Sequence, residues 1–302
     1  MALVPAVLLG AALALAFQSQ EQNNTAPPTA ASQPGPASVT AQEDIPYRSA
    51  QGSLLRLDVY APAGPRTEPR PAVVLIHGGG WTSLDKSTMR RMGEFLARSG
   101  FVAFAVDYRL FANNENRWPA QLDDVQRAVR WVRANAAKYG IDPERIGAFG
   151  HSAGAQLAAL LGEEDTRDNS DAALAKYSSK VQAVVDVSGP TDFTRDHASD
   201  GRSFLADFLG TDYSKNPEIW RQASPALRVS KGDAPFLIVH GTQDESVPLS
   251  QAQELFDKLH SAGVPVSLIK VNDVHTFQTA EARRQLAIQT LAFFERYLAV
   301  SQ

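Results

Sequence analysis

The strongest chemical signal in the sequence lies at residues 150–154, which read Gly-His-Ser-Ala-Gly and fit the pattern G-x-S-x-G. A short apolar stretch, residues 146–149, precedes the motif, and a run of small residues, 153–161, follows it. This order predicts a strand, a sharp turn and a helix, with the serine in a strained conformation at the positive end of the helix. We therefore predict that Ser152 is a nucleophile. The alternative is a serine that caps a helix after a glycine turn.

A second motif, His-Gly-Gly-Gly-Trp at residues 77–81, directly follows another apolar stretch. Glycines there would let backbone N–H groups face an oxygen that becomes negative in a reaction, and each such donor contributes about 3 kcal/mol. We predict such an oxyanion hole from the amides of Gly79, Gly80 and Ala153. A tight turn or a phosphate-binding loop is the alternative, but no Gly-Lys-Ser/Thr follows. His77 is expected to hold the glycine loop.

A serine hydroxyl needs an adjacent base, and six histidines compete for that role. His275 lies between a predicted strand and the last predicted helix, so we predict that it is the base. The other four candidates besides His77 have simpler explanations: packing, a helix surface, a place in an insertion, and a side chain turned away beside the nucleophile. They are, in that order, His240, His260, His197 and His151.

The acid that orients the base should follow a strand and precede His275 in the sequence. Asp244 meets both conditions, and we predict that its carboxylate fixes the imidazole tautomer. Three other carboxyl groups stay open as alternatives: Glu245, Asp273 and Asp192.

The remaining candidates carry weaker predictions. Trp81 is predicted to line a substrate pocket, although an aromatic side chain that packs the loop is an equal alternative. Asp107 and Arg109 are expected to fix loops. No spacing of histidines and carboxylates indicates a metal site, and no cofactor is implied.

Short apolar runs that alternate with amphipathic segments must position these residues. They predict an α/β fold, in which a mostly parallel central sheet carries helices on both faces. Two irregular stretches, 163–180 and 191–231, are interpreted as cap-like or pocket insertions. The predicted strands are 54–60, 72–76, 101–106, 146–149, 181–187, 236–239 and 266–271, and the predicted helices are 87–98, 119–137, 153–161, 249–261 and 281–298.

The N-terminal residues predict export. Residues 1–17 are almost wholly apolar and end in an Ala-x-Ala pattern typical of a cleaved signal peptide, although no Lys or Arg precedes the run. Residues 18–43 are rich in Gln, Pro, Ser and Thr and are interpreted as a disordered linker. The folded domain is predicted to span 44–300. We expect a secreted or periplasmic protein, with an uncleaved anchor as the alternative.

The overall composition excludes several classes of function. The net charge is −4 with scattered basic residues, which predicts no nucleic-acid partner and no anionic-membrane patch. The chain has no cysteine, which excludes disulfides, a thiol nucleophile and a thiolate zinc site. The sequence does not predict an oligomeric state.

Four motifs together carry a family resemblance: residues 77–81, 106–110, 141–146 and 150–154. Over roughly 44–298 the chain resembles the hormone-sensitive-lipase-like esterases of the α/β-hydrolase fold, most of all the branch of bifunctional feruloyl and acetyl-xylan esterases. Ala155 departs from this pattern, because many relatives carry a second glycine there. The resemblance implies the same nucleophile, acid, base and oxyanion donors as above.

The resemblance also implies an activity. It implies hydrolysis of a carboxylic ester through an acyl-enzyme, with acetyl or feruloyl esters of plant polysaccharide as the expected substrates. The alternatives are an exported esterase for lipids or small molecules, an aminopeptidase-like hydrolase, and a non-catalytic binder of small molecules on the same fold.

Overall fold

The computed structural model describes residues 38–298, apart from 51, 66–67 and 196–200. The predicted signal peptide at 1–17, residues 18–37 of the predicted linker, His197 and the last two residues of the predicted domain lie outside this part of the chain. All described residues belong to one compact unit.

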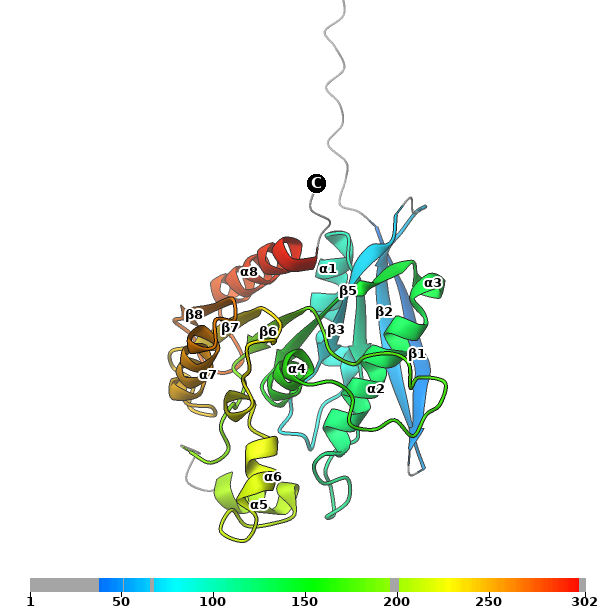
Figure 1. Cartoon of the computed structure of the whole chain (residues 1–302). Helices are drawn as coiled ribbons and strands as arrows, with labels where there is room; N and C mark the ends of the chain where they lie inside the picture. The colour runs from blue at the N-terminus through cyan, green and yellow to red at the C-terminus, as the bar shows by residue number, and fades with distance from the viewer. Residues whose placement is uncertain (1–37, 51, 66–67, 196–200, 299–302) are drawn as a thin grey trace, which may run out of the picture. The chain divides into compact units, whose positions relative to one another are not determined.

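An eight-stranded sheet forms the centre of this unit, in the order β1-β2-β4-β3-β5-β6-β7-β8 (Figure 1). The pairs β1/β2 and β2/β4 are antiparallel, and all pairs from β4 to β8 are parallel. The predicted mostly parallel sheet is therefore confirmed. The strands are β1 (Val39–Ala50), β2 (Ser53–Pro62), β3 (Arg70–Ile76), β4 (Val102–Val106), β5 (Ile141–His151), β6 (Ala183–Val187), β7 (Phe236–Gly241) and β8 (Val266–Val271).

Helices cover both faces of the sheet, as predicted. Helices α1 and α8 pack on one face, and α2, α4 and α7 pack on the other (Figure 1). The helices are α1 (Arg90–Arg98), α2 (Ala120–Ala134), α3 (Ala136–Tyr139), α4 (Ala153–Glu163), α5 (Gly201–Leu209), α6 (Pro217–Gln222), α7 (Leu249–Ser261) and α8 (Ala280–Leu298), with 3-10 turns η1 (Lys86–Met89) and η2 (Pro225–Leu227).

Strand β3 explains why the central strands appear in the sequence as continuous apolar runs. Val73 and Leu75 belong to the core under α1 and α8, whereas Val74 and Ile76 belong to the core under α2 and α4. Side chains alternate across a strand, so a strand covered on both faces needs apolar residues at every position.

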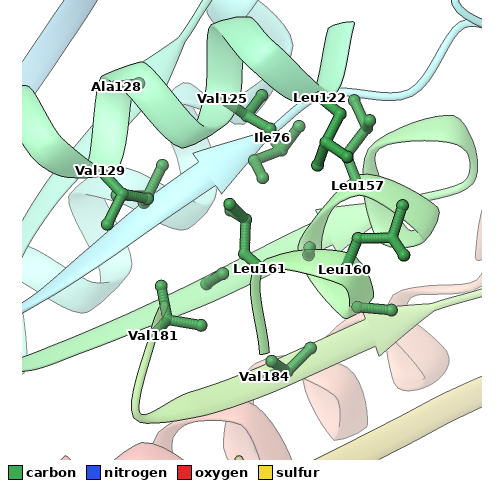
Figure 2. Close-up of a cluster of buried hydrophobic side chains, with 14 of the residues drawn as sticks. Ile76, Leu122, Val125, Ala128, Val129, Leu157, Leu160, Leu161, Val181 and Val184 are labelled. Atoms are coloured by element: carbon green, nitrogen blue, oxygen red, sulfur yellow. The ribbon is translucent and has the colours of Figure 1, made fainter. Parts of the chain in front are cut away.

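The core between α2, α4 and the sheet fixes the position of α4 (Figure 2). Leu122 and Val125 of α2 meet Leu157 and Leu161 of α4, and all four are fully buried. Burial of one leucine side chain contributes about 1.5–3 kcal/mol. Helix α4 begins one residue after Ser152, so this packing also fixes the predicted nucleophile.

The predicted start of the folded domain is wrong. Strand β1 begins at Val39 and pairs with β2, so residues 39–43, predicted as linker, belong to the sheet. The strand lies at the sheet edge and most of its side chains are exposed, which allows polar residues that a central strand would exclude. The polar composition of residues 39–43 is therefore compatible with an edge strand, although it is also typical of a linker.

The four segments predicted to form the active site follow the carboxyl ends of four strands. The glycine loop follows β3, the nucleophile β5, the acid β7 and the base β8. These strands are parallel, so their carboxyl ends lie at the same edge of the sheet, where ligands bind in open α/β sheets.

Candidate active site

Ser152 occupies a turn that only small neighbours allow. Its φ of 55° and ψ of −122° are strained for a residue with a side chain. A Cβ on Gly150 would lie 2.1 Å from the carbonyl oxygen of Gly154, and a Cβ on Gly154 would lie 2.3 Å from that of Ile76. The glycines therefore let β5 turn directly into α4 and present the serine at the start of the helix.

The three residues predicted as nucleophile, base and acid lie in hydrogen-bond contact. The Ser152 hydroxyl lies 2.8 Å from Nε2 of His275, and Nδ1 of His275 lies 2.7 Å from Oδ2 of Asp244. With its proton on Nδ1, the imidazole donates to the carboxylate and leaves Nε2 free to accept from the hydroxyl. The arrangement can pass the serine proton to the imidazole.

Asp244 is held as an anion. Burial raises the pKa of its carboxyl, but hydrogen bonds from His240 and His275 outweigh burial and hold the pKa well below its usual value. A carboxylate in this state stabilises an imidazolium that forms beside it.

Two of the competing carboxyl groups, those of Asp273 and Asp192, bind other partners than His275. Asp273 accepts hydrogen bonds from the amides of Val274, Gln278 and Thr279, and so shapes the loop around the base. Asp192 accepts from Thr194, 2.6 Å from its hydroxyl. Neither makes a described hydrogen bond to His275.

The glycine loop after β3 carries two of the predicted oxyanion donors. Gly79 and Gly80 have positive φ values of 99° and 57°, which glycine adopts without strain. No described hydrogen bond within residues 38–298 uses either amide as donor. Ala153 is the first residue of α4, where amides have no acceptor within the helix. Gly80, Ala153, Ser152 and His275 line one cavity.

His77 lies beneath this loop. Its ring stacks on Tyr108 at 4.2 Å, and burial lowers the pKa of its imidazole to about 4, so the ring is neutral. The Tyr108 hydroxyl lies 3.1 Å from the carbonyl oxygens of both His77 and Gly78. The pair holds the backbone that leads into the glycines, which agrees with the expected role of His77.

The structure gives two further histidines contacts that sequence analysis missed. Nε2 of His151 donates to the carbonyl oxygen of His275 at 3.0 Å. Nε2 of His240 lies 3.3 Å from Oδ2 of Asp244 and 2.9 Å from the carbonyl oxygen of Val247. Both side chains thus hold the loops of the base and the acid. Their main partners are backbone carbonyl groups, which every residue has, so no sequence motif predicts these contacts.

The cavity in front of Ser152 has a volume of about 200 Å³ and a mainly apolar wall. Trp81 lines it, and also donates from Nε1 to Gln156 at 3.2 Å and stacks on Phe208 at 4.8 Å. Trp81 therefore both lines the pocket and packs the loop. Phe204 and Leu205 of α5 complete the wall, so the insertion at 191–231 does contribute to the pocket.

A comparison with known families identifies the fold. The model of the BD-FAE family matches residues 57–259. The chain belongs to the BD-FAE family. The predicted likeness to α/β-hydrolase esterases is confirmed.

Three relatives illustrate the BD-FAE likeness. Esterase LipC of Mycobacterium tuberculosis is 33% identical over 68% of this chain and 52% of its own length. Esterase 2 of Thermogutta terrifontis, solved with propionate bound, is 27% identical with a TM-score of 0.72, over 89% of this chain and 97% of that one. A truncated carbohydrate esterase from gut microbiota is 29% identical with a TM-score of 0.72, over 87% and 98%. The chain spans about half the length of the curated relatives it matches.

The other insertion in this BD-FAE chain, predicted as a cap-like or a pocket insertion, does not line the cavity in front of Ser152, so the pocket alternative is not supported. Residues 163–180 pack against α2: Nε of Arg130 donates to the carbonyl oxygen of Leu174 at 2.9 Å, and Arg127 pairs with Asp171. No residue of this stretch lines the cavity. The stretch covers the helix instead.

The residues that the structure describes lack two further features, a metal cluster and a membrane span. No group of three or more histidine and carboxylate side chains there is arranged to hold a metal ion. None of the described helices has the length and apolar character of a membrane span.

Proposed function

We propose that the chain is a serine hydrolase of carboxylic esters that reacts through an acyl-enzyme on Ser152. The carrying observation is the contact of Ser152 with His275 at 2.8 Å and of His275 with Asp244 at 2.7 Å. The family membership and the esterases among the relatives support the same reaction.

In the proposed mechanism, Nε2 of His275 takes the hydroxyl proton as Oγ of Ser152 attacks the ester carbon. The carbonyl oxygen becomes negative and is stabilised by the amides predicted as donors, those of Gly79, Gly80 and Ala153. His275 then protonates the leaving alcohol, which departs and leaves the acyl group on Oγ. Water attacks the acyl-enzyme with the same base and releases the acid.

The decisive variant is Ser152→Ala. It removes the nucleophile, so turnover of p-nitrophenyl acetate should fall by at least ~10⁴-fold while circular dichroism stays unchanged. Ser250→Ala is the matched control, because Ser250 is exposed on α7 and does not line the cavity. Turnover that survived in Ser152→Ala would contradict the assignment. Labelling by a fluorophosphonate separates an enzyme from a binder on the same fold.

For the substrate, we propose acyl esters of carbohydrate, with acetylated polysaccharide as the expected class and feruloylated polysaccharide as the alternative. The small apolar cavity suits a short acyl group. The similar esterase solved with propionate bound supports a short acyl half, and the similar carbohydrate esterase supports a sugar as the alcohol half. Release of acetate or ferulate from xylan should exceed hydrolysis of lipid-like esters. A strong preference for p-nitrophenyl esters over acetylated xylan would favour a general carboxylesterase.

We also propose export of the chain, on the apolar character of residues 1–17. N-terminal sequencing of secreted or periplasmic protein should find a start near Phe17. An intact Met1 on cytosolic protein would contradict this proposal.

A further inference from the structure

A second cavity, of about 440 Å³, lies on the other side of the loop that carries His275. Its lining residues come mainly from α1 and the start of α8, which cover the same face of the sheet. It shares no lining residue with the cavity in front of Ser152. Its wall is mainly apolar and includes Met89, Met92, Phe95 and Leu286.

Three arginines line the same cavity: Arg91, Arg283 and Arg284. All three are exposed, and no ion pair joins any of them to a carboxylate among the residues that the structure describes. Arg283 lies in the first turn of α8 and Arg284 directly follows it, near the end where the helix dipole adds positive potential. Arg283 already donates from Nη1 to the carbonyl oxygens of Phe277 and Gln278, so Arg91 and Arg284 are the guanidinium groups left to meet a ligand beside the apolar wall.

We propose that this cavity binds an aliphatic monocarboxylate. The aliphatic tail of this ligand would lie on the methionines and Phe95, while the guanidinium groups would hold its carboxylate through charge-assisted, bidentate hydrogen bonds. A neutral molecule with the same chain would gain the apolar contacts alone.

An occupant would touch the residues that hold the predicted base. Thr276 and Phe277, which directly follow His275, line the cavity. His151 lines it too, and its Nε2 donates to the carbonyl oxygen of His275 at 3.0 Å. A carboxylate bound here therefore alters ester turnover without entering the cavity in front of Ser152. This coupling rests on the proposed function, whereas the binding itself does not.

The methionines provide a built-in reporter. The chain has only three, and two of them, Met89 and Met92, line the second cavity, whereas none lines the first. In the full chain labelled with ¹³C-methyl methionine, decanoate should shift the resonances of both residues in a saturable way. Decanol should bind at least tenfold more weakly. The absence of a shift up to the solubility limit of decanoate would overturn the proposal, as would equal binding of decanol.

Variants test separately how the arginine charges and the apolar wall contribute to decanoate binding. The double variant Arg91→Glu and Arg284→Glu should weaken decanoate binding at least tenfold, and Ala287→Phe should weaken it by filling the cavity. Arg296→Glu, on the exposed last turn of α8 and away from the cavity, is the control and should change binding less than twofold. Equal binding by the double variant and the control would overturn the site.

The coupling has its own readout. Decanoate should lower kcat for p-nitrophenyl acetate at saturating substrate in the wild type, and should have at least a tenfold weaker effect in the double variant. Saturable methionine shifts with unchanged kcat would overturn the coupling and leave the site in place. If the chain hydrolysed no ester, the proposed function would fail, and the methionine titration would still decide the site.

Discussion

The carboxylate of Asp244 has more partners than an interaction with His275 alone requires. Its Oδ1 accepts the amides of Ser246 and Val247, each at 2.9 Å, and Nε2 of His240 approaches Oδ2 to 3.3 Å. His240 is fully buried and also bonds to the carbonyl oxygen of Val247. His240 therefore fixes both the acid and the turn that follows it, and acts as a positioning residue.

This role predicts the effect of His240→Phe. The change leaves the buried carbonyl of Val247 without its donor, which costs about 1–3 kcal/mol of stability. It also frees the carboxylate to rotate, so kcat for p-nitrophenyl acetate should fall about tenfold with little change in KM. Steady-state kinetics and urea unfolding measure both effects. His260→Phe, on the exposed face of α7, is the control, and a wild-type kcat in His240→Phe would contradict the role.

At the residue scale, the sequence located the contacts that follow from strand order and missed those that depend on folded loops. Ser152, Asp244 and His275 each follow a strand, and parallel strands bring such residues to one edge. Their catalytic roles stay predictions. The contacts of His151 and His240 depend on backbone carbonyls brought close by folding, which no local pattern encodes.

Among the elements, central strands were predictable and the edge and insertions were not. Strands β3 and β4 are buried on both faces, which forces a continuous apolar run. Strand β1 contacts the core mainly through Ile45 and Tyr47, too few apolar positions to mark a strand. Both insertions are irregular in sequence, but the second is longer and richer in aromatic residues, and only the second lines the cavity.

We predict that helix α5 of that insertion limits the size of the acyl group, because two of its residues, Phe204 and Leu205, line the cavity. Phe204 lines the cavity and stacks with Phe208 at 6.3 Å. Phe204→Ala should enlarge the acyl side, and the ratio of kcat/KM for p-nitrophenyl hexanoate over acetate should rise about tenfold, since one methylene in a pocket is worth about 1–3 kcal/mol. Tyr213→Ala is the control, because Tyr213 is exposed in the same insertion but does not line the cavity. An unchanged ratio would show that α5 does not limit the acyl group.

The whole molecule contains a buried carboxyl group that opposes folding at neutral pH. Asp186, on β6, is 1% exposed; its Oδ1 accepts the amide of Gly189 at 3.0 Å, whereas Oδ2 has no described partner. Burial raises the pKa of this carboxyl to about 6 from its usual 3.8. Above pH 4 the unfolded chain ionises there while the folded chain keeps the proton. Stability is therefore lost as pH rises from about 4 to 6.

Removal of the ionisable group at Asp186 should stabilise the folded protein only at pH values at which the carboxyl group would be ionised. A shift from 3.8 to about 6 corresponds to about 3 kcal/mol above pH 6. Asp186→Asn keeps an oxygen for the Gly189 amide but cannot ionise, so it should raise the free energy of unfolding by up to about 3 kcal/mol at pH 8 and by much less at pH 4. Urea unfolding at the two pH values measures the difference. Asp257→Asn, exposed on α7, should show no such dependence, and an equal gain at both pH values in Asp186→Asn would mean that ionisation at this position does not limit stability.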